Sequence, residues 1–94
     1  MVIPQPSAQH RPLENAAGLP SAEELRAAIA RRLSDTAGGD EGRWADLAGA
    51  VEVLPIALNP ACNWRVTPDG SWGEVEVIWR AVEHVRVLHP HARP

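Results

Sequence analysis

One cysteine and three histidines in the second half of the 94-residue chain are the residue types that could bind a metal or act as a nucleophile. They are Cys62, His84, His89 and His91. Structural zinc sites usually contain closely spaced ligand pairs such as Cys-x₂-Cys, and the chain has a single Cys. His84 and His89 are five residues apart, so on a helix they would point about 140° away from each other. We therefore expect no metal and no cofactor.

Cys62 and a group of charged residues further along the chain could take part in nucleophilic or acid–base catalysis. A thiol nucleophile needs a neighbouring base, whereas Cys62 falls on the same side of a predicted strand as Trp64, which predicts a buried and unreactive thiol. Charged residues at helical spacing are also typical of a solvated helix face; here they are Glu76, Arg80, Glu83 and His84. A small thiol- or metal-dependent enzyme that uses Cys62, His84 and Glu83 remains an alternative interpretation.

Two Trp–Arg neighbours, Trp64–Arg65 and Arg43–Trp44, are a combination that can stack on bases and contact phosphates. The chain, however, has nine basic and twelve acidic residues and a net charge of -3. This balance excludes a generally basic protein that coats nucleic acid. A weak nucleic-acid binder using Trp64, Arg65 and Arg43 is kept as a second alternative, and nucleic acid is not the partner we expect.

The first half of the chain predicts a tail followed by two helices. Residues 1–20 contain four prolines and no apolar period, which predicts a mobile Pro-rich N-terminal tail or a docking arm. Ser21 and Glu24 form a capping-box pattern, and a helix should run from there to Gly38–Gly39. Its core-facing stripe is Leu25, Ile29 and Leu33. Asp40 is the expected cap of a short helix over 41–48.

Two β-rich runs follow and predict an antiparallel hairpin. The first is Val51 to Leu58, placed at an edge because Pro55 has no N–H to donate. The second runs from Cys62 to Thr67. Its alternation predicts that one set of side chains faces the core (Cys62, Trp64, Val66) and the other faces solvent (Asn63, Arg65, Thr67).

Residues 71–89 fit both a helix and a strand, and their length favours the helix. Ser71 and Glu74 repeat the capping-box pattern. A strand of about 15 uninterrupted residues would be exceptional, because strands usually run 3–10 residues. The chain is therefore predicted to be a single small α+β domain over 21–90, in the order helix, short helix, strand, strand, helix, with a hairpin packed on two helices and residues 91–94 as its C-terminal end.

The last predicted helix carries more apolar residues than so small a domain can cover. A core of this size rarely supplies more than about 3–5 kcal/mol without a disulfide, a metal or a partner. We therefore expect a non-catalytic interaction or accessory module that forms a homo-oligomer, most simply a dimer, with the N-terminal tail or edge strand as a further protein contact. The predicted interface residues are Trp72, Trp79, Val75, Ile78, Val82 and Val85. No signal peptide and no membrane segment is visible, which predicts a cytoplasmic protein.

Overall fold

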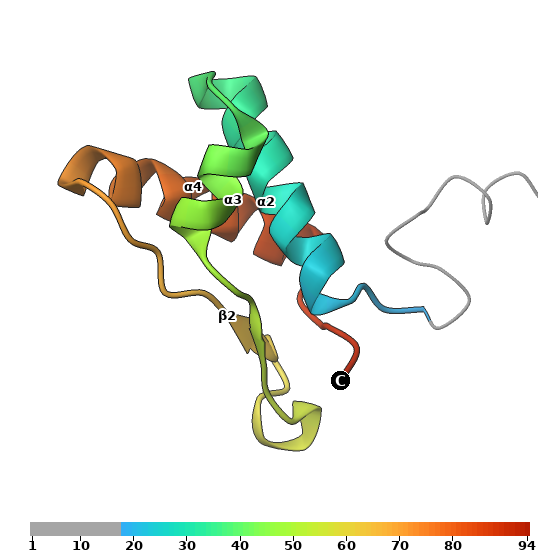
Figure 1. Ribbon diagram of the computed structural model, residues 1–94. Helices are drawn as coiled ribbons and strands as arrows, with labels where there is room; N and C mark the ends of the chain where they lie inside the picture. Colours follow the sequence, from blue (N-terminus) through green and yellow to red (C-terminus); the bar gives the residue numbers. More distant parts are fainter. Residues whose placement is uncertain (1–17) are drawn as a thin grey trace, which may run out of the picture.

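Three helices and one short antiparallel hairpin make up residues 18–94, the part of the chain that the computed structural model describes (Figure 1). The elements are α2 (Ala22–Ala37), α3 (Glu41–Ala48), β1 (Glu52–Val53), the 3₁₀ helix η2 (Ile56–Leu58), β2 (Trp64–Arg65) and α4 (Trp72–Leu88). This order confirms the predicted small α+β fold with a hairpin packed on helices. The prediction of a mobile tail falls mostly on residues 1–17, which lie outside the described residues.

All three helices begin where the sequence predicts, because their first backbone N–H groups are capped locally. At the start of α2, the Glu24 N–H donates to Ser21 Oγ at 3.1 Å and the Ser21 N–H donates to Glu24 Oε1 at 2.8 Å. Ser71 and Glu74 make the same reciprocal pair at the start of α4, at 3.2 and 2.9 Å. The helical interpretation of residues 71–89 is thereby confirmed, and Asp40 caps α3 as expected.

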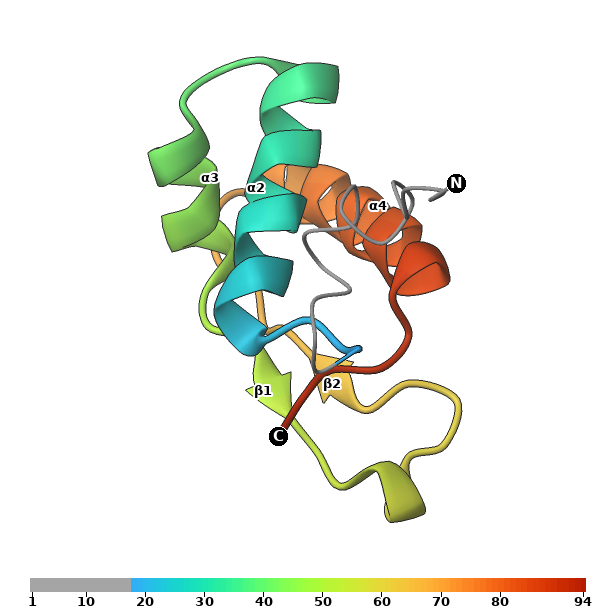
Figure 2. The same cartoon turned by 90° about the vertical axis from the view of Figure 1, so that its right-hand side faces the viewer.

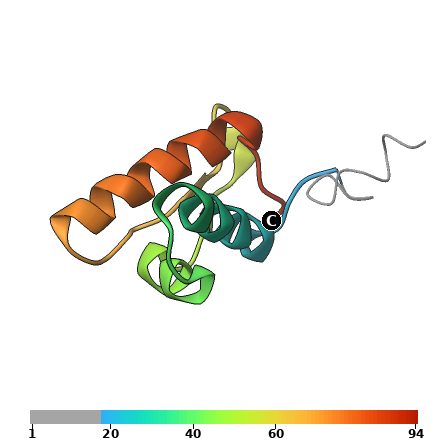
Figure 3. The ribbon, with the colours of Figure 1, turned by 90° about the horizontal axis from the view of Figure 1, so that it is seen from above.

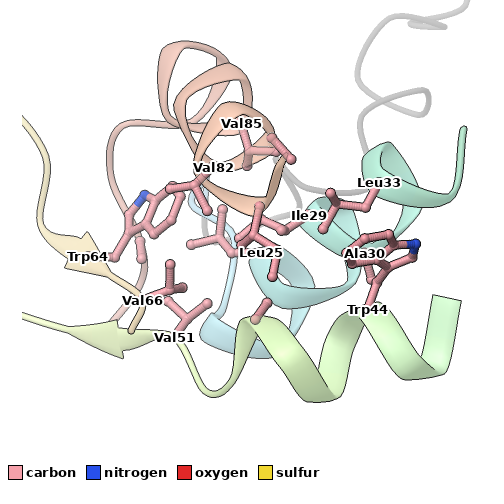
Figure 4. Packing of buried hydrophobic residues seen from close by; sticks show 14 residues of the cluster. Leu25, Ile29, Ala30, Leu33, Trp44, Val51, Trp64, Val66, Val82 and Val85 are labelled. Carbon is pink, nitrogen blue, oxygen red and sulfur yellow. The ribbon is translucent and has the colours of Figure 1, made fainter. Parts of the chain in front are cut away.

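The core lies between α2, α3, α4 and the hairpin, with Trp44 and Ala48 contributed by α3 (Figure 4). The α2 stripe of Leu25, Ile29 and Leu33 is fully buried. Figure 4 shows Leu25 and Ile29 pointing toward Val82 and Val85 of α4. Burial of a Leu, Ile or Val side chain contributes about 1.5–3 kcal/mol, so this contact between the two helices holds the fold together.

The hairpin is much shorter than the sequence predicts, and the expected strand from Val51 to Leu58 is wrong beyond Val53. In the register of the hairpin, Glu52 pairs with Arg65 and Val53 pairs with Trp64. One further hydrogen bond runs from the Leu54 N–H to the Asn63 carbonyl at 2.7 Å. Pro55 then begins the 3₁₀ turn of η2, since it cannot donate to the ladder. The second strand is likewise only two residues long.

The prediction that Asn63 faces solvent is also wrong, because its side chain is buried. The predicted alternation holds at Trp64 and Val66, which are buried, and at Arg65, which is exposed. Asn63, however, is only 1% exposed. Its amide binds the backbone of Ala92, accepting from the Ala92 N–H at 2.6 Å and donating to the Ala92 carbonyl at 2.9 Å.

The C-terminal segment therefore takes part in the fold. It runs past the hairpin and the start of α2 (Figure 2). The Arg93 N–H donates to the Pro20 carbonyl at 2.8 Å, and the Trp64 indole N–H donates to the His89 carbonyl at 2.8 Å. Stabilising contacts thus extend on both sides of the expected limits 21–90, to Leu19 at one end and Arg93 at the other.

Candidate functional site

The four tryptophans divide into two buried and two exposed side chains. Trp44 and Trp64 are 9% and 1% exposed, and their indole N–H groups donate to the carbonyls of Gly38 and His89. Trp72 is 92% exposed and Trp79 is 39% exposed. Trp72 and Trp79 are seven residues apart on α4, so they lie on one side of that helix about two turns apart.

The exposed pair lies on the part of α4 that the other described residues leave at least partly uncovered. Seen from above, the N-terminal end of α4 reaches beyond α2 (Figure 3). The buried residues of α4 begin only at Ile78. We use the name tryptophan face for the shallow surface hollow formed by Trp72, Gly73, Val75, Glu76 and Trp79.

The projecting end of α4 is held in place by polar contacts to α3. Arg43 of α3 donates to Glu74 of α4 at 2.7 Å. The backbone N–H of Ser71, and then Arg43, lower the pKa of the Glu74 carboxyl. The first turn of α4 is therefore fixed relative to α3, and the indole of Trp72 stands on an anchored helix rather than on a loose end.

Of the six predicted interface residues, three are accessible and three are used inside the chain. Ile78, Val82 and Val85 are 0–3% exposed in the core, so a single chain already covers them. Trp72 and Trp79 are exposed, and Val75 is half-buried on the tryptophan face.

A second apolar surface lies between α2 and the C-terminal half of α4. We call it the α2–α4 groove; its volume is about 470 Å³. Its floor is formed by small and apolar side chains, and its rims carry charged and imidazole groups. The lining residues are Glu24, Ala27, Ala28, Arg31, Arg32, Asp35, His84, Val85, Leu88 and His89.

The sequence analysis missed this groove, although a signal for it exists. Ala27, Arg31 and Asp35 repeat every four residues along α2 and form a second helix face beside the buried stripe. Two adjacent small residues, Ala27 and Ala28, leave room there for another chain or side chain. A helix with a second, partly apolar face of this kind is a candidate for a further packing contact.

The candidate catalytic residues lie on different surfaces. The Cys62 thiol is half-buried beside β2 and donates to the Trp64 carbonyl at 3.4 Å. His84 lines the α2–α4 groove, which does not include Cys62. Glu83 is paired with Arg86 at 2.7 Å. Within residues 18–94, Cys62, His84 and Glu83 are therefore not brought together at one site.

The three histidines of the described chain lie at two places. His84 and His89 both line the α2–α4 groove, whereas His91 Nε2 lies 2.6 Å from the Pro60 carbonyl, at the far end of the hairpin. Within residues 18–94, no group of three or more His, Cys, Asp or Glu side chains is placed to hold a metal ion.

The Trp–Arg neighbours do not form a base-stacking platform. Trp64 is buried, and the Arg86 guanidinium lies 5.3 Å from its ring centroid. Arg65 is bonded to Glu52 at 2.7 Å, which raises the pKa of its guanidinium, and Arg43 is bonded to Glu74. None of these residues places an exposed aromatic ring next to an arginine that is free of an ion pair.

No helix of residues 18–94 has both the length and the apolar character that crossing a bilayer requires. Comparisons with protein-family models, with curated proteins and with solved structures found no match to this chain.

Proposed function

We propose that the chain is a small, non-catalytic protein-interaction module that associates with further copies of itself through the tryptophan face of α4. The observation that carries the proposal is the 92% exposure of Trp72. Trp is strongly enriched among the residues that dominate binding energy at protein interfaces. A second, partly exposed Trp beside it makes a concentrated aromatic patch, and such patches on soluble domains mark interaction sites.

The apolar area of the face supplies part of the free energy that association needs. With 92% of Trp72 and 39% of Trp79 exposed, and roughly 200 Å² for a whole side chain, covering both removes about 260 Å² from water. At ~25 cal/mol per Å², this burial contributes about 6 kcal/mol. Association costs about 4–15 kcal/mol, because the two chains lose translational and rotational freedom. The two tryptophans alone offset only the lower part of that cost, and the apolar surface that they cover on the other copy must supply the rest. We therefore expect weak association that depends on protein concentration.

The charges near the face favour a second copy of the chain as the partner. Glu76 is paired with Arg80 at 3.3 Å, and Glu83 is paired with Arg86 at 2.7 Å. Both signs of charge are therefore present along the face, and two copies do not meet as surfaces of like charge. The net charge of the whole chain, -3, adds little repulsion.

Light scattering on a sizing column at increasing protein concentration tests the proposal. The mass should rise above the 10.2 kDa of one chain as concentration increases through the micromolar range. Trp72→Ala should return the mass to that of one chain at the same concentrations. Because Trp72 packs against so little of its own chain, circular dichroism and thermal unfolding of this variant should stay close to those of the parent.

Val87→Ala is the matched control. Val87 lies on the same helix and is 80% exposed, but it is outside the tryptophan face. Its replacement should leave the concentration dependence of the mass unchanged. A parent chain that stays at one-chain mass up to high micromolar concentration would refute the proposal.

A further inference from the structure

We infer that the α2–α4 groove of one copy receives the tryptophan face of the next, so that copies join head to tail. This inference rests on the proposed self-association and specifies which surface the tryptophan face binds. It is carried by three properties of the two surfaces: their shapes, their charges and their positions on opposite sides of α4.

The groove has the form that an aromatic side chain needs. Its floor consists of Ala27 and Ala28 on α2 and of Val85 and Leu88 on α4. Leu88 is 57% exposed, so the apolar surface of the groove lies open to solvent in a single chain. Its volume of about 470 Å³ is close to the 510 Å³ of the hollow at the tryptophan face, so the lining of the groove, and not its volume, favours it as the receptor. An indole inserted there would be desolvated together with Leu88.

The charges that border the two surfaces are complementary. Arg31 and Arg32 on the groove rim are exposed and have no ion-pair partner within residues 18–94. The Glu76 and Glu83 side chains near the tryptophan face are 68% and 63% exposed, so each carboxylate can accept from a second guanidinium. The groove is also lined by two acids, Asp35 and Glu24, of which Glu24 is paired with Arg93 at 3.6 Å, so the charges on the rim without an ion pair to another described residue are two Arg and one Asp. Such complementarity favours pairing of face with groove.

The two surfaces point in opposite directions from α4. Trp79 and Leu88 are nine residues apart, so at 100° per residue they lie about 180° apart around the helix and about 13 Å apart along it. A copy whose groove binds the tryptophan face of its neighbour still presents its own tryptophan face on the opposite side of α4. Contacts between two different patches therefore continue from copy to copy, whereas a contact of one patch with itself closes as a two-fold dimer.

Full-length single variants and their mixture test the inference. Ala27→Glu places a carboxylate in the groove at an exposed helix position and should abolish association, as Trp72→Ala does. Ala50→Glu, an added acid at an exposed residue outside the groove, is the matched control and should associate like the parent.

The equimolar mixture gives the decisive result. The Trp72→Ala chain keeps an intact groove and the Ala27→Glu chain keeps an intact face, so together they should form a complex of two chains, twice 10.2 kDa, that grows no further. If Ala27→Glu associates like the parent while Trp72→Ala does not, the faces bind each other, and the inference fails although the proposed function stands. A mixture that stays at one-chain mass also overturns the inference. A parent chain that never associates refutes the proposed function itself.

Discussion

Replacing Asn63 with Ala should destabilise the chain more than any exposed polar substitution in the hairpin. The Asn63 side chain makes three hydrogen bonds to backbone groups: to the Leu54 carbonyl at 3.0 Å, to the Ala92 carbonyl at 2.9 Å and from the Ala92 N–H at 2.6 Å. A hydrogen bond contributes about 1 kcal/mol net, and a buried group left without its partner costs about 1–3 kcal/mol. The expected loss is therefore about 3–5 kcal/mol.

A loss of that size is comparable to the roughly 3–5 kcal/mol that a core of this size supplies. Urea unfolding followed by circular dichroism measures it. Asn59→Ala is the matched control: the Asn59 amide makes one exposed bond to the Pro55 carbonyl at 3.0 Å, so its loss should cost less than about 1 kcal/mol. The reasoning is refuted if the two variants unfold at the same urea concentration.

Three further predictions concern a turn, the helix caps and the thiol. Gly39→Ala should cost about 1–2 kcal/mol in thermal unfolding, because φ is +95° there and the new Cβ would lie 3.3 Å from the Trp44 indole nitrogen; an unchanged melting temperature would contradict this. Hydrogen bonds from the N-cap backbone lower the pKa of the Glu24 and Glu74 carboxyls in the folded chain. The stability that these two carboxylates confer is therefore complete above the pKa of an unfolded carboxyl, near 4, and is lost as the pH falls through their pKa in the folded chain. The urea concentration at the midpoint of unfolding should therefore decrease as the pH is lowered from about 5 to about 3. The decrease should be smaller in a variant with both residues changed to Gln. Cys62 should react with a thiol reagent more slowly in the native chain than in denaturant, because it is half-buried; equal rates would show that the thiol is open.

The helices could be predicted because their signals are local. The capping boxes at Ser21 and Ser71 involve residues three positions apart, and the structure contains both. The α2 stripe also needs only the period of a helix to be identified. In such segments, the residues that decide the structure are neighbours in the sequence.

The hairpin and the carboxyl end depend on contacts between distant residues, and there the sequence was less informative. Asn63 looked solvent-facing by alternation, but its burial is set by Ala92, 29 residues later. The β-branched content of residues 51–58 indicated a strand, while the missing N–H of Pro55 ended the pairing early.

The interface role of the candidate site stays a prediction, and the structure reports only which of its residues are exposed. The sequence identified Trp72 and Trp79 as apolar residues in excess of what the core could use, and both are exposed. It also assigned Ile78, Val82 and Val85 to an interface, because a helical pattern does not show which part of a broad apolar face its own chain will cover. The α2–α4 groove depends on the crossing of two helices, which no local pattern specifies.

Iodide quenching of tryptophan fluorescence tests the central claim most directly, because it reports whether Trp72 itself becomes covered. The contribution of Trp72 is the difference between the parent chain and Trp72→Phe, and the buried Trp44 and Trp64 should contribute little to quenching at any concentration. If the tryptophan face binds another copy, quenching of Trp72 should be strong in dilute solution and should fall as protein concentration rises, in step with the increase in mass. Quenching that remains strong and constant from low to high micromolar concentration would show that Trp72 stays in water, and would contradict the account.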